Sequence, residues 1–287
     1  MLPFGMVRHR ASLAGVEVGG GLRVVVVGAL NVSPESFHAA SVHLDHDALL
    51  RAAAGMQEAG AGLVDVGARS TAPYLPTAID EDEEARRLAR AVEILTSKLS
   101  VPVSADTARA LPARAAVEAG ARVINDVRGL RDAGLARLVA EHRAGVIAMA
   151  SPGPEQPVGG PLETVEARLG EILDRARAAG LALDRVVLDP GIGFFREGAL
   201  PWHAWDALVL ANLPRLAALG RPLCVGVSRK SFVGAITGRP STTDRLAGSL
   251  AATTAAVLGG AALIRTHDVA ETVDAVRVAE RVREAGA

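Results

Sequence analysis

The chain has 287 residues, of which 49% are hydrophobic and 22% charged, and its formal net charge is -1 at pH 7. A near-neutral chain lacks the basic excess that binding to nucleic acid or a membrane surface requires, so we expect neither partner. The start of the chain has no apolar stretch of signal-peptide length, and we expect a cytoplasmic protein. The single cysteine, Cys224, lies in an apolar run and is expected to be a buried, inert thiol.

A repeating pattern of strands and helices follows residues 1–22, which we interpret as a short extended N-terminal prelude. Short apolar runs typical of buried parallel strands alternate with longer helical segments. The expected strands are 23–30, 62–66, 101–105, 121–124, 145–150, 185–189, 222–227 and 261–264. The expected helices are 45–59, 80–99, 108–119, 131–142, 162–180, 199–218, 242–259 and 269–285.

Eight such alternations predict an α/β protein, a (β/α)8 TIM barrel that forms one domain over residues 1–287. A doubly wound open sheet is the alternative. Such a sheet usually carries a glycine-rich fingerprint in its first turn, which residues 31–37 do not match. In a barrel the active site lies at the carboxyl ends of the strands, where polar residues of this chain gather. They are Asn31, Asp106, Asn125, Asp189, Lys230, Arg265 and His267.

Asp189 is the clearest candidate for ligand binding. It ends an apolar run and is followed by Pro190 and Gly191, which stop the strand and let a ligand approach the backbone. A carboxylate can accept two parallel N–H bonds from the amidine-like edge of a flat heterocycle. The sequence therefore predicts a nitrogen heterocycle bound at this strand end.

Positive charge is expected on the opposite side of the same mouth. Lys230, Arg265 and His267 gather there, and a helix that begins at Ser231 adds free N–H groups. An anionic group joined to the heterocycle is predicted.

Several motifs resemble dihydropteroate synthase, a pterin-binding family, from about residue 26 to residue 279. One of them is Leu-Asp-Pro-Gly-Ile-Gly-Phe at 188–194. The others are residues 31–37, 65–67 with 70–71, 106–107, 124–126, 226–232 and 265–269. The resemblance implies a transferase of folate biosynthesis that condenses a dihydropterin methyl diphosphate with 4-aminobenzoate and releases diphosphate. It also implies Mg²⁺ and a homodimer whose partners are these two small molecules.

The resemblance also implies roles for individual residues. The implied pterin-binding residues are Asp106, Asn125, Asp189 and Lys230, and the implied catalytic residues are Asp106, Lys230 and Arg265. The implied diphosphate-binding residues are Asn31, Arg265 and His267, with Asn31 as the metal ligand. The implied aminobenzoate-binding residues are Phe37, Thr71, Pro73 and Ser231.

Four segments depart from the family pattern, one of them around Ala148-Met-Ala150, where the family has Met-His-Met. His38-Ala-Ala-Ser41 stands in place of Ser-Asp-Gly-Gly, Arg69-Ser-Thr-Ala-Pro73 in place of Glu-Ser-Thr-Arg-Pro, and Phe195-Arg196 in place of Gly-Lys. A pterin-binding paralogue with altered or lost condensation activity is therefore one alternative. A methyltetrahydrofolate-dependent methyltransferase is another, although it has no need of the diphosphate-binding Arg265 and His267.

Some of these residues also have plain structural alternatives. Asn125 and Asp126 could cap the following turn, and His267 could be a structural histidine. Asp65 is expected to brace loops rather than touch a ligand. The alanine-rich helix 242–259 is expected to serve packing or a subunit interface.

Overall fold

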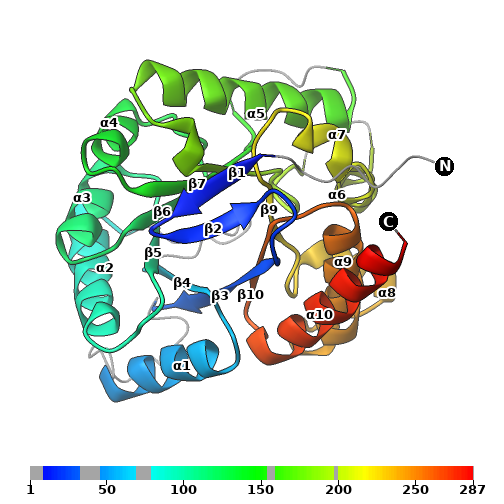
Figure 1. The fold of residues 1–287 in the computed structure, drawn as a ribbon, viewed down its shortest axis with the longest axis horizontal. Coiled ribbons are helices and arrows are strands. Elements are labelled where there is room, and N and C mark those ends of the chain that lie inside the picture. The colour runs from blue at the N-terminus through cyan, green and yellow to red at the C-terminus, as the bar shows by residue number, and fades with distance from the viewer. Residues whose placement is uncertain (1–8, 33–45, 69–78, 154–158, 197–199, 287) are drawn as a thin grey trace.

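The architecture is a nearly closed barrel of parallel strands surrounded by helices (Figure 1). A computed structural model describes residues 9–32, 46–68, 79–153, 159–196 and 200–286. The barrel strands are β3 (Val25–Asn31), β4 (Leu63–Gly67), β5 (Val103–Asp106), β6 (Val123–Asp126), β7 (Gly145–Met149), β8 (Val186–Asp189), β9 (Cys224–Gly226) and β10 (Leu263–Thr266). They follow the order β8-β7-β6-β5-β4-β3-β10-β9, and a parallel bridge between Leu188 and Leu223 joins the two ends. The predicted (β/α)8 barrel is confirmed.

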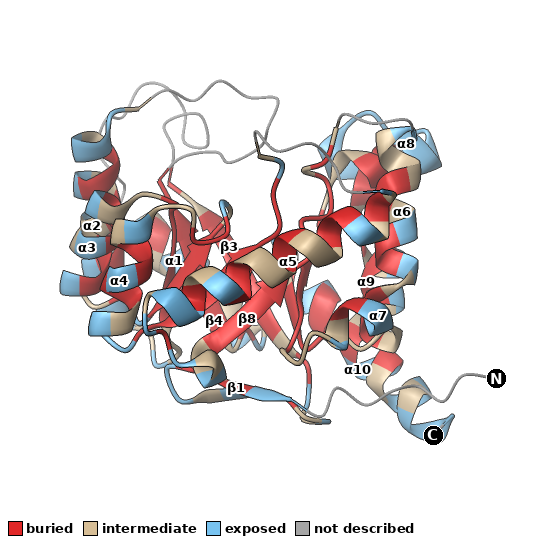
Figure 2. Ribbon diagram, turned by 90° about the horizontal axis from the view of Figure 1, so that it is seen from above, coloured by how far each residue is buried: buried red, intermediate tan, exposed pale blue. Residues whose placement is uncertain are grey.

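Helices cover the outside of the barrel, and the strands between them are buried (Figure 2). The helices are α1 (His46–Glu58), α2 (Glu81–Thr96), α3 (Ala110–Glu118), α4 (Ala133–Glu141), α5 (Pro161–Ala178), α6 (Trp202–Ala211), α7 (Leu213–Ala217), α8 (Ser231–Thr237), α9 (Leu246–Leu258) and α10 (Val269–Ala285). Two 3-10 turns, η1 (Leu183–Arg185) and η2 (Thr242–Arg245), precede β8 and α9.

The N-terminal prelude forms a β-hairpin that closes the amino end of the barrel. Strands β1 (Arg10–Leu13) and β2 (Val16–Gly19) pair antiparallel across Ala14 and Gly15. Both turn residues have positive φ, 54° and 87°, as the tight hairpin turns that match strand twist require. Leu13 is fully buried and packs in one cluster with the first inward-facing residues of the barrel strands. The barrel is thus plugged at one end, which leaves the carboxyl end for ligands.

The predicted helix 199–218 is wrong as one continuous helix. It is divided into α6 and α7, with Asn212 between them outside helical geometry. Pro214 causes the break, because proline lacks the N–H that a continuous helix needs and its ring clashes with the carbonyl four residues earlier. The last strand also differs from the prediction: β10 continues to Thr266, so Arg265 is a strand residue rather than a loop residue.

Candidate active site

The alternation of side chains along each strand places polar groups inside the barrel mouth. Leu63, Val123, Val187 and Leu263 pack inside the barrel with the hairpin. Side chains two positions apart on a strand share a face. The next inward-facing residues along these strands are Asp65, Asn125, Asp189 and Arg265. A polar layer therefore lies directly above the apolar interior, at the carboxyl ends of the strands.

Arg265 is held between two buried carboxylates. Its Nε donates to Asp65 Oδ2 at 2.7 Å and its Nη2 donates to Asp106 Oδ2 at 2.9 Å. Asp65 is fully buried and Asp106 is 6% exposed. Although burial opposes the charge, these carboxylates raise the pKa of Arg265 above its ordinary range. The guanidinium is therefore permanently charged and fixed in direction.

Asp65 braces side chains of the site, not loops as the sequence suggested. Besides Arg265, its Oδ2 accepts a hydrogen bond from Asn125 Nδ2 at 2.9 Å. This contact uses the donor end of the amide, so that the Asn125 carbonyl oxygen is the end left for a ligand. Asn125 is therefore oriented by Asp65. Asp126, by contrast, accepts from the backbone N–H groups of Arg128 and Leu130, which confirms the turn-capping alternative for this residue.

Asp189 and Lys230 form the other half of the site. Asp189 is 8% exposed, and its Oδ1 accepts from the Gly191 N–H at 2.7 Å. Burial raises the pKa of the Asp189 carboxyl, an effect that the nearby Lys230 ammonium opposes. Burial likewise lowers the pKa of Lys230, and Asp189 opposes that shift. Each group thus favours the charged form of the other inside a poorly solvated pocket.

The turn after Asp189 can be formed only by glycine at one position. Gly191 has φ +73°, and a Cβ atom built there would lie 2.0 Å from the carbonyl oxygen of Ala150. The turn therefore packs against the end of β7, with no room for a side chain. This close packing fixes the height of Asp189 in the mouth.

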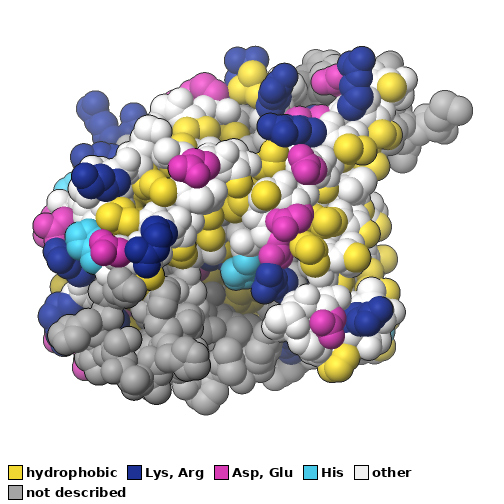
Figure 3. Space-filling model, turned by 90° about the horizontal axis from the view of Figure 1, so that it is seen from below, with side chains coloured by type: hydrophobic (Ala, Val, Ile, Leu, Met, Phe, Trp, Pro, Cys, Tyr) yellow, Lys and Arg dark blue, Asp and Glu magenta, His cyan; other side chains and the backbone are white. Residues whose placement is uncertain are grey.

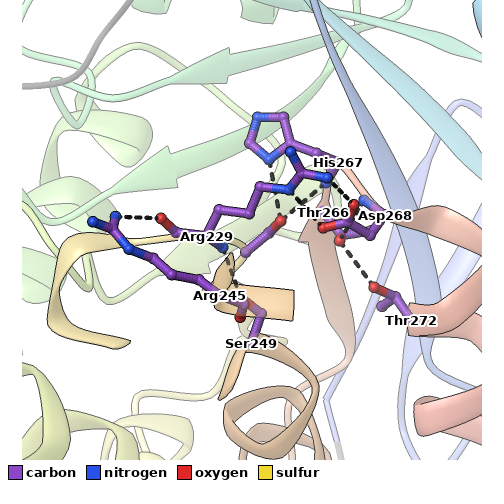
Figure 4. A network of polar contacts seen from close by, with 8 residues as sticks. Arg229, Arg245, Ser249, Thr266, His267, Asp268 and Thr272 are labelled. Carbon is purple, nitrogen blue, oxygen red and sulfur yellow. Dashed lines mark hydrogen bonds and ion pairs between the residues drawn. The ribbon is translucent and has the colours of Figure 1, made fainter. Parts of the chain in front are cut away.

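A polar network joins the ends of β9 and β10 (Figure 4). Arg229 has a positive φ of 56°, and its guanidinium binds both carboxylate oxygens of Asp268. Its backbone N–H donates to Ser249 Oγ at 2.8 Å, and Arg245 Nη1 donates to its carbonyl at 3.0 Å. A non-glycine residue in this backbone region is strained, and these contacts maintain it. The network thus fixes the backbone immediately before Lys230.

His267 is neutral at pH 7, which corrects the expectation that it adds positive charge. Its Nδ1 lies 3.1 Å from Ser228 Oγ, in a partly buried contact. Desolvation, together with the charges of Arg265 and Arg229, lowers the pKa of His267 to about 4. The imidazole is thus suited to hydrogen bonding with an anion, not to offsetting its charge.

We expect the imidazole of His267 to titrate near pH 4, which NMR of ¹³C-labelled histidine would measure. The His267→Ala variant assigns the resonance. Because the folded pKa lies below the unfolded one, this group removes stability as the pH falls from about 6.5 to about 4. Titration of His267 near pH 6.5 in the folded protein would contradict the assignment.

The geometry agrees with comparisons to known proteins. The family model described as pterin binding enzyme matches residues 27–267. The chain belongs to this family. It is 34% identical to the dihydropteroate synthase of Synechocystis over 268 residues, covering 91% of this chain and 90% of that protein. It is 38% identical over 265 residues, or 90% of this chain, to a probable bifunctional folylpolyglutamate synthase/dihydropteroate synthase of Haloferax volcanii, and spans 30% of its length.

Solved structures of this pterin-binding family share the fold closely. The dihydropteroate synthase of Xanthomonas albilineans with 4-aminobenzoic acid superposes with a TM-score of 0.86 at 39% identity. The match covers 96% of this chain and 98% of that chain. The same enzyme in complex with 7,8-dihydropteroate superposes with a TM-score of 0.84 at 37% identity, with the same coverage.

The structure gathers most of the predicted site residues at one mouth of this pterin-binding barrel. Asp65 links Asn125 to Arg265, and Arg265 also binds Asp106. Asp189 lies with Lys230. Asn31 ends β3 and pairs with Gly67 of β4. Phe37, Thr71 and Pro73 lie outside the described residues. The helix predicted at Ser231 is α8, which is only 7 residues long.

Asp206 was not predicted as a functional residue. This residue is fully buried on α6, and its Oδ1 accepts from the Gly193 N–H at 2.7 Å. A single carboxylate within the otherwise apolar segment Trp202–Ala211 was the available signal, because an acidic residue there needs a buried partner. Cys224 is buried as predicted, and burial raises the pKa of its thiol.

The described part of the chain holds neither a membrane-spanning helix nor a cluster of metal-binding side chains. Within residues 9–32, 46–68, 79–153, 159–196 and 200–286, no helix has the length and apolar character to span a membrane. In the same ranges no three His, Cys, Asp or Glu side chains lie together as a metal-binding group.

Proposed function

We propose that this protein is a dihydropteroate synthase that condenses a dihydropterin methyl diphosphate with 4-aminobenzoate and releases diphosphate, in folate biosynthesis. The observation that carries the proposal is Arg265, fixed by Asp65 and Asp106 at the mouth that also holds Asp189 and Lys230. Hydrogen-bond acceptors for a heterocycle and cations for an anionic group thus lie together at one mouth of the barrel. The dihydropteroate synthases that match over nearly the whole chain support the same activity.

The pterin is proposed to bind between Asp189 and Asn125. The Asp189 carboxylate accepts N–H bonds from the amidine-like edge of the ring, and the Asn125 carbonyl oxygen accepts a further one. Lys230 donates to ring acceptors on the other side. Since Asp65 orients Asn125 and Gly191 orients Asp189, both acceptors are set before the ligand arrives.

Mg²⁺ is proposed to bind together with the diphosphate. Asn31 would hold it as a single protein ligand, with the remaining positions filled by diphosphate oxygens and water, an arrangement that this ion often adopts. Asn31 fits such a site, because it ends β3 at the carboxyl edge of the barrel, beside Gly67 of β4, and its side-chain amide offers an oxygen ligand. When bound, the ion neutralises negative charge on the leaving diphosphate.

The reaction breaks the C–O bond between the pterin methylene carbon and the diphosphate, and the bonding electron pair leaves with the diphosphate. Arg265 meets the negative charge of the leaving group, and the Asp106 carboxylate stabilises the positive charge that develops on the pterin methyl group. The amine lone pair then forms the C–N bond, and the nitrogen loses a proton to solvent. No strong base is needed, because an arylamine is already nucleophilic and the cation is reactive.

The carboxylate of the aminobenzoate is proposed to bind at Arg196 and Ser231. Arg196 Nη2 donates to Ser231 Oγ, and its guanidinium carbon lies 4.3 Å from the centroid of the Trp202 ring. Trp202 thus holds a planar cation next to a hydroxyl whose own proton can be donated to a second acceptor. Arg196 belongs to a segment that departs from the family pattern, since Phe195-Arg196 stands where the family has Gly-Lys.

The Arg196→Ala variant is expected to raise KM for 4-aminobenzoate by about tenfold to hundredfold, as for the loss of one charge-assisted hydrogen bond. KM for the neutral 4-aminobenzamide and affinity for the pterin should change little, because neither places a carboxylate at this position. Steady-state kinetics with both amines measure the difference. The control is Arg215→Ala, since Arg215 pairs with Glu163 and Glu166 on the outside of the barrel. Equal losses for the two amines would exclude a carboxylate contact.

A condensation assay with pterin diphosphate and 4-aminobenzoate, run beside calorimetry of pterin binding, tests the proposed function. Formation of dihydropteroate supports it. Pterin binding without product would favour the alternative of a non-condensing paralogue, for which the altered segments at 38–41 and 69–73 are the evidence. The alternative of a methyltransferase is disfavoured, because that reaction releases no diphosphate for Arg265 to bind.

A cytoplasmic location and a homodimer remain part of the proposal. Hydrophobic side chains gather on the half of the surface over α9 and α10 (Figure 3). Val278 and Val282, one helical turn apart on α10, are 63% and 56% exposed. Apolar side chains exposed together favour a subunit interface. Sedimentation of the protein as a monomer at micromolar concentration would contradict the homodimer.

A further inference from the structure

Asp206 is a buried carboxylate that the proposed reaction does not use. It stands in the middle of α6, fully buried among Trp205, Val209 and Leu210. A buried charge costs several kcal/mol, on the order of the stability of a domain, unless polar groups compensate it. Its partners therefore indicate what the residue does.

The first partner is the turn that carries Lys230. Asp206 Oδ1 accepts from the Gly193 N–H, and Gly193 has φ +89°. A Cβ atom at Gly193 would lie 2.9 Å from Lys230 Cδ, so the lysine stem rests directly on this glycine. Lys230 Nζ donates to the Ile192 carbonyl and lies 4.9 Å from the centroid of the Phe194 ring. Three consecutive residues of the turn thus contact Lys230, and Asp206 anchors the middle one.

The second oxygen of Asp206 is buried as well. Within the described part of the chain, Oδ2 is buried and has no hydrogen-bond partner. Burial raises the pKa of Asp206. The Gly193 N–H and the neighbouring Lys230, Arg196 and His203 oppose this rise. The Asp206 carboxylate is therefore held close enough to the lysine to interact with it electrostatically, without a hydrogen bond between them.

The pKa of Lys230 depends on such nearby negative charges. Burial lowers its pKa, and Asp189 and then Asp206 act against that shift, while Arg265 adds to it. Cys224 acts in the same direction as the two carboxylates, but less. Asp189 is also the proposed ligand of the pterin edge, whereas Asp206 is bonded to the turn and has no part in the proposed reaction. The Asp206 carboxylate can thus act on Lys230 without also binding the pterin.

We propose that Asp206 is a positioning residue for Lys230, which it holds in place through the turn at Gly193 and keeps charged through its own carboxylate. That Lys230 binds the pterin rests on the proposed function. The role of Asp206 toward Lys230 does not, because it follows from contacts within the protein. Its loss should therefore be visible in the lysine itself, with or without substrate.

The chain offers a direct test, since Lys98 and Lys230 are its only lysines. Protein labelled with ¹³C at the lysine ε carbon gives two side-chain resonances, and Lys98, which is exposed, is the internal control. Asp206→Asn keeps an oxygen for the Gly193 N–H but removes the charge. Lys230 should then titrate at a lower pH than in the parent protein, while the titration of Lys98 is unchanged. Lys230→Met assigns the resonances.

Two more variants separate the turn from the charge. Gly193→Ala leaves the carboxylate in place but pushes on the lysine stem, so it should shift the Lys230 resonance even if Asp206→Asn fails to fold. Glu84→Gln removes a carboxylate that is equally buried, bound instead to Thr107 and Arg109, and should leave the Lys230 titration where it is. Thermal unfolding verifies that each variant is folded.

Pterin binding provides the functional measurement. Asp206→Ala, which removes both the acceptor and the charge, should weaken pterin affinity by roughly tenfold, and the loss should grow as the pH rises and Lys230 deprotonates. An unchanged Lys230 titration in folded Asp206→Asn, or a shift of equal size in Glu84→Gln, would overturn the assignment. If the parent protein bound no pterin, the proposed function would fail, and the lysine titration would still decide the role of Asp206.

Discussion

The Asp189→Asn variant is expected to lose pterin binding by at least about 100-fold while the barrel stays folded. The Gly191 N–H can still donate to the amide oxygen, so the turn after β8 keeps its anchor. The amide NH₂ then occupies the second oxygen's position and meets a ligand edge that itself donates. A buried donor without an acceptor costs about 1–3 kcal/mol, and the lost charge adds to this, which together exceed a factor of 100.

Calorimetry with the pterin measures this loss, and circular dichroism verifies the fold. The matched control is Asp132→Asn, which removes the same charge from the N-cap of α4, where asparagine caps as well as aspartate. Control and parent should bind the pterin alike. Unchanged affinity in folded Asp189→Asn would place the heterocycle elsewhere.

The Arg265→Ala variant is expected to lose both stability and diphosphate affinity. Without the guanidinium, the carboxylates of Asp65 and Asp106 remain close together and buried, with no cation between them. Removing one partner of a buried ion pair costs about 3–5 kcal/mol, and partial exposure of Arg265 places the expected loss near the lower value. Chemical denaturation measures this change.

A comparison of two ligands separates the effect of Arg265→Ala on diphosphate affinity from its effect on stability. Arg265→Ala should weaken pterin diphosphate far more than the unphosphorylated pterin alcohol, because only the diphosphate carries charge that the guanidinium meets. Arg265→Lys restores a charge but not the planar fork that reaches both carboxylates, so it should recover only part of the stability. Equal losses of affinity for the two ligands in Arg265→Ala would show that Arg265 contacts no diphosphate.

The sequence determined the barrel and the positions of its ligand-binding side chains. Parallel strands buried on both faces appear as short apolar runs, and a polar residue where a run ends must face the carboxyl end of the barrel. Asp106, Asn125 and Asp189 were predicted at the site in this way, and they lie at one mouth. Residue order along the chain suffices for this prediction, because strand periodicity and the direction of parallel strands fix where such a side chain points.

Only the tertiary structure decided how those side chains act on one another. Asp65 reaches Arg265 across 200 residues of sequence, and Asp206 reaches Gly193 from a helix for which no polar role was predicted. His267 was expected to be charged and is neutral, because burial lowers its pKa and because Arg265 and Arg229 lie beside it. Electrostatic coupling depends on distance in space and on exclusion of water, and neither can be obtained from residue order along the chain.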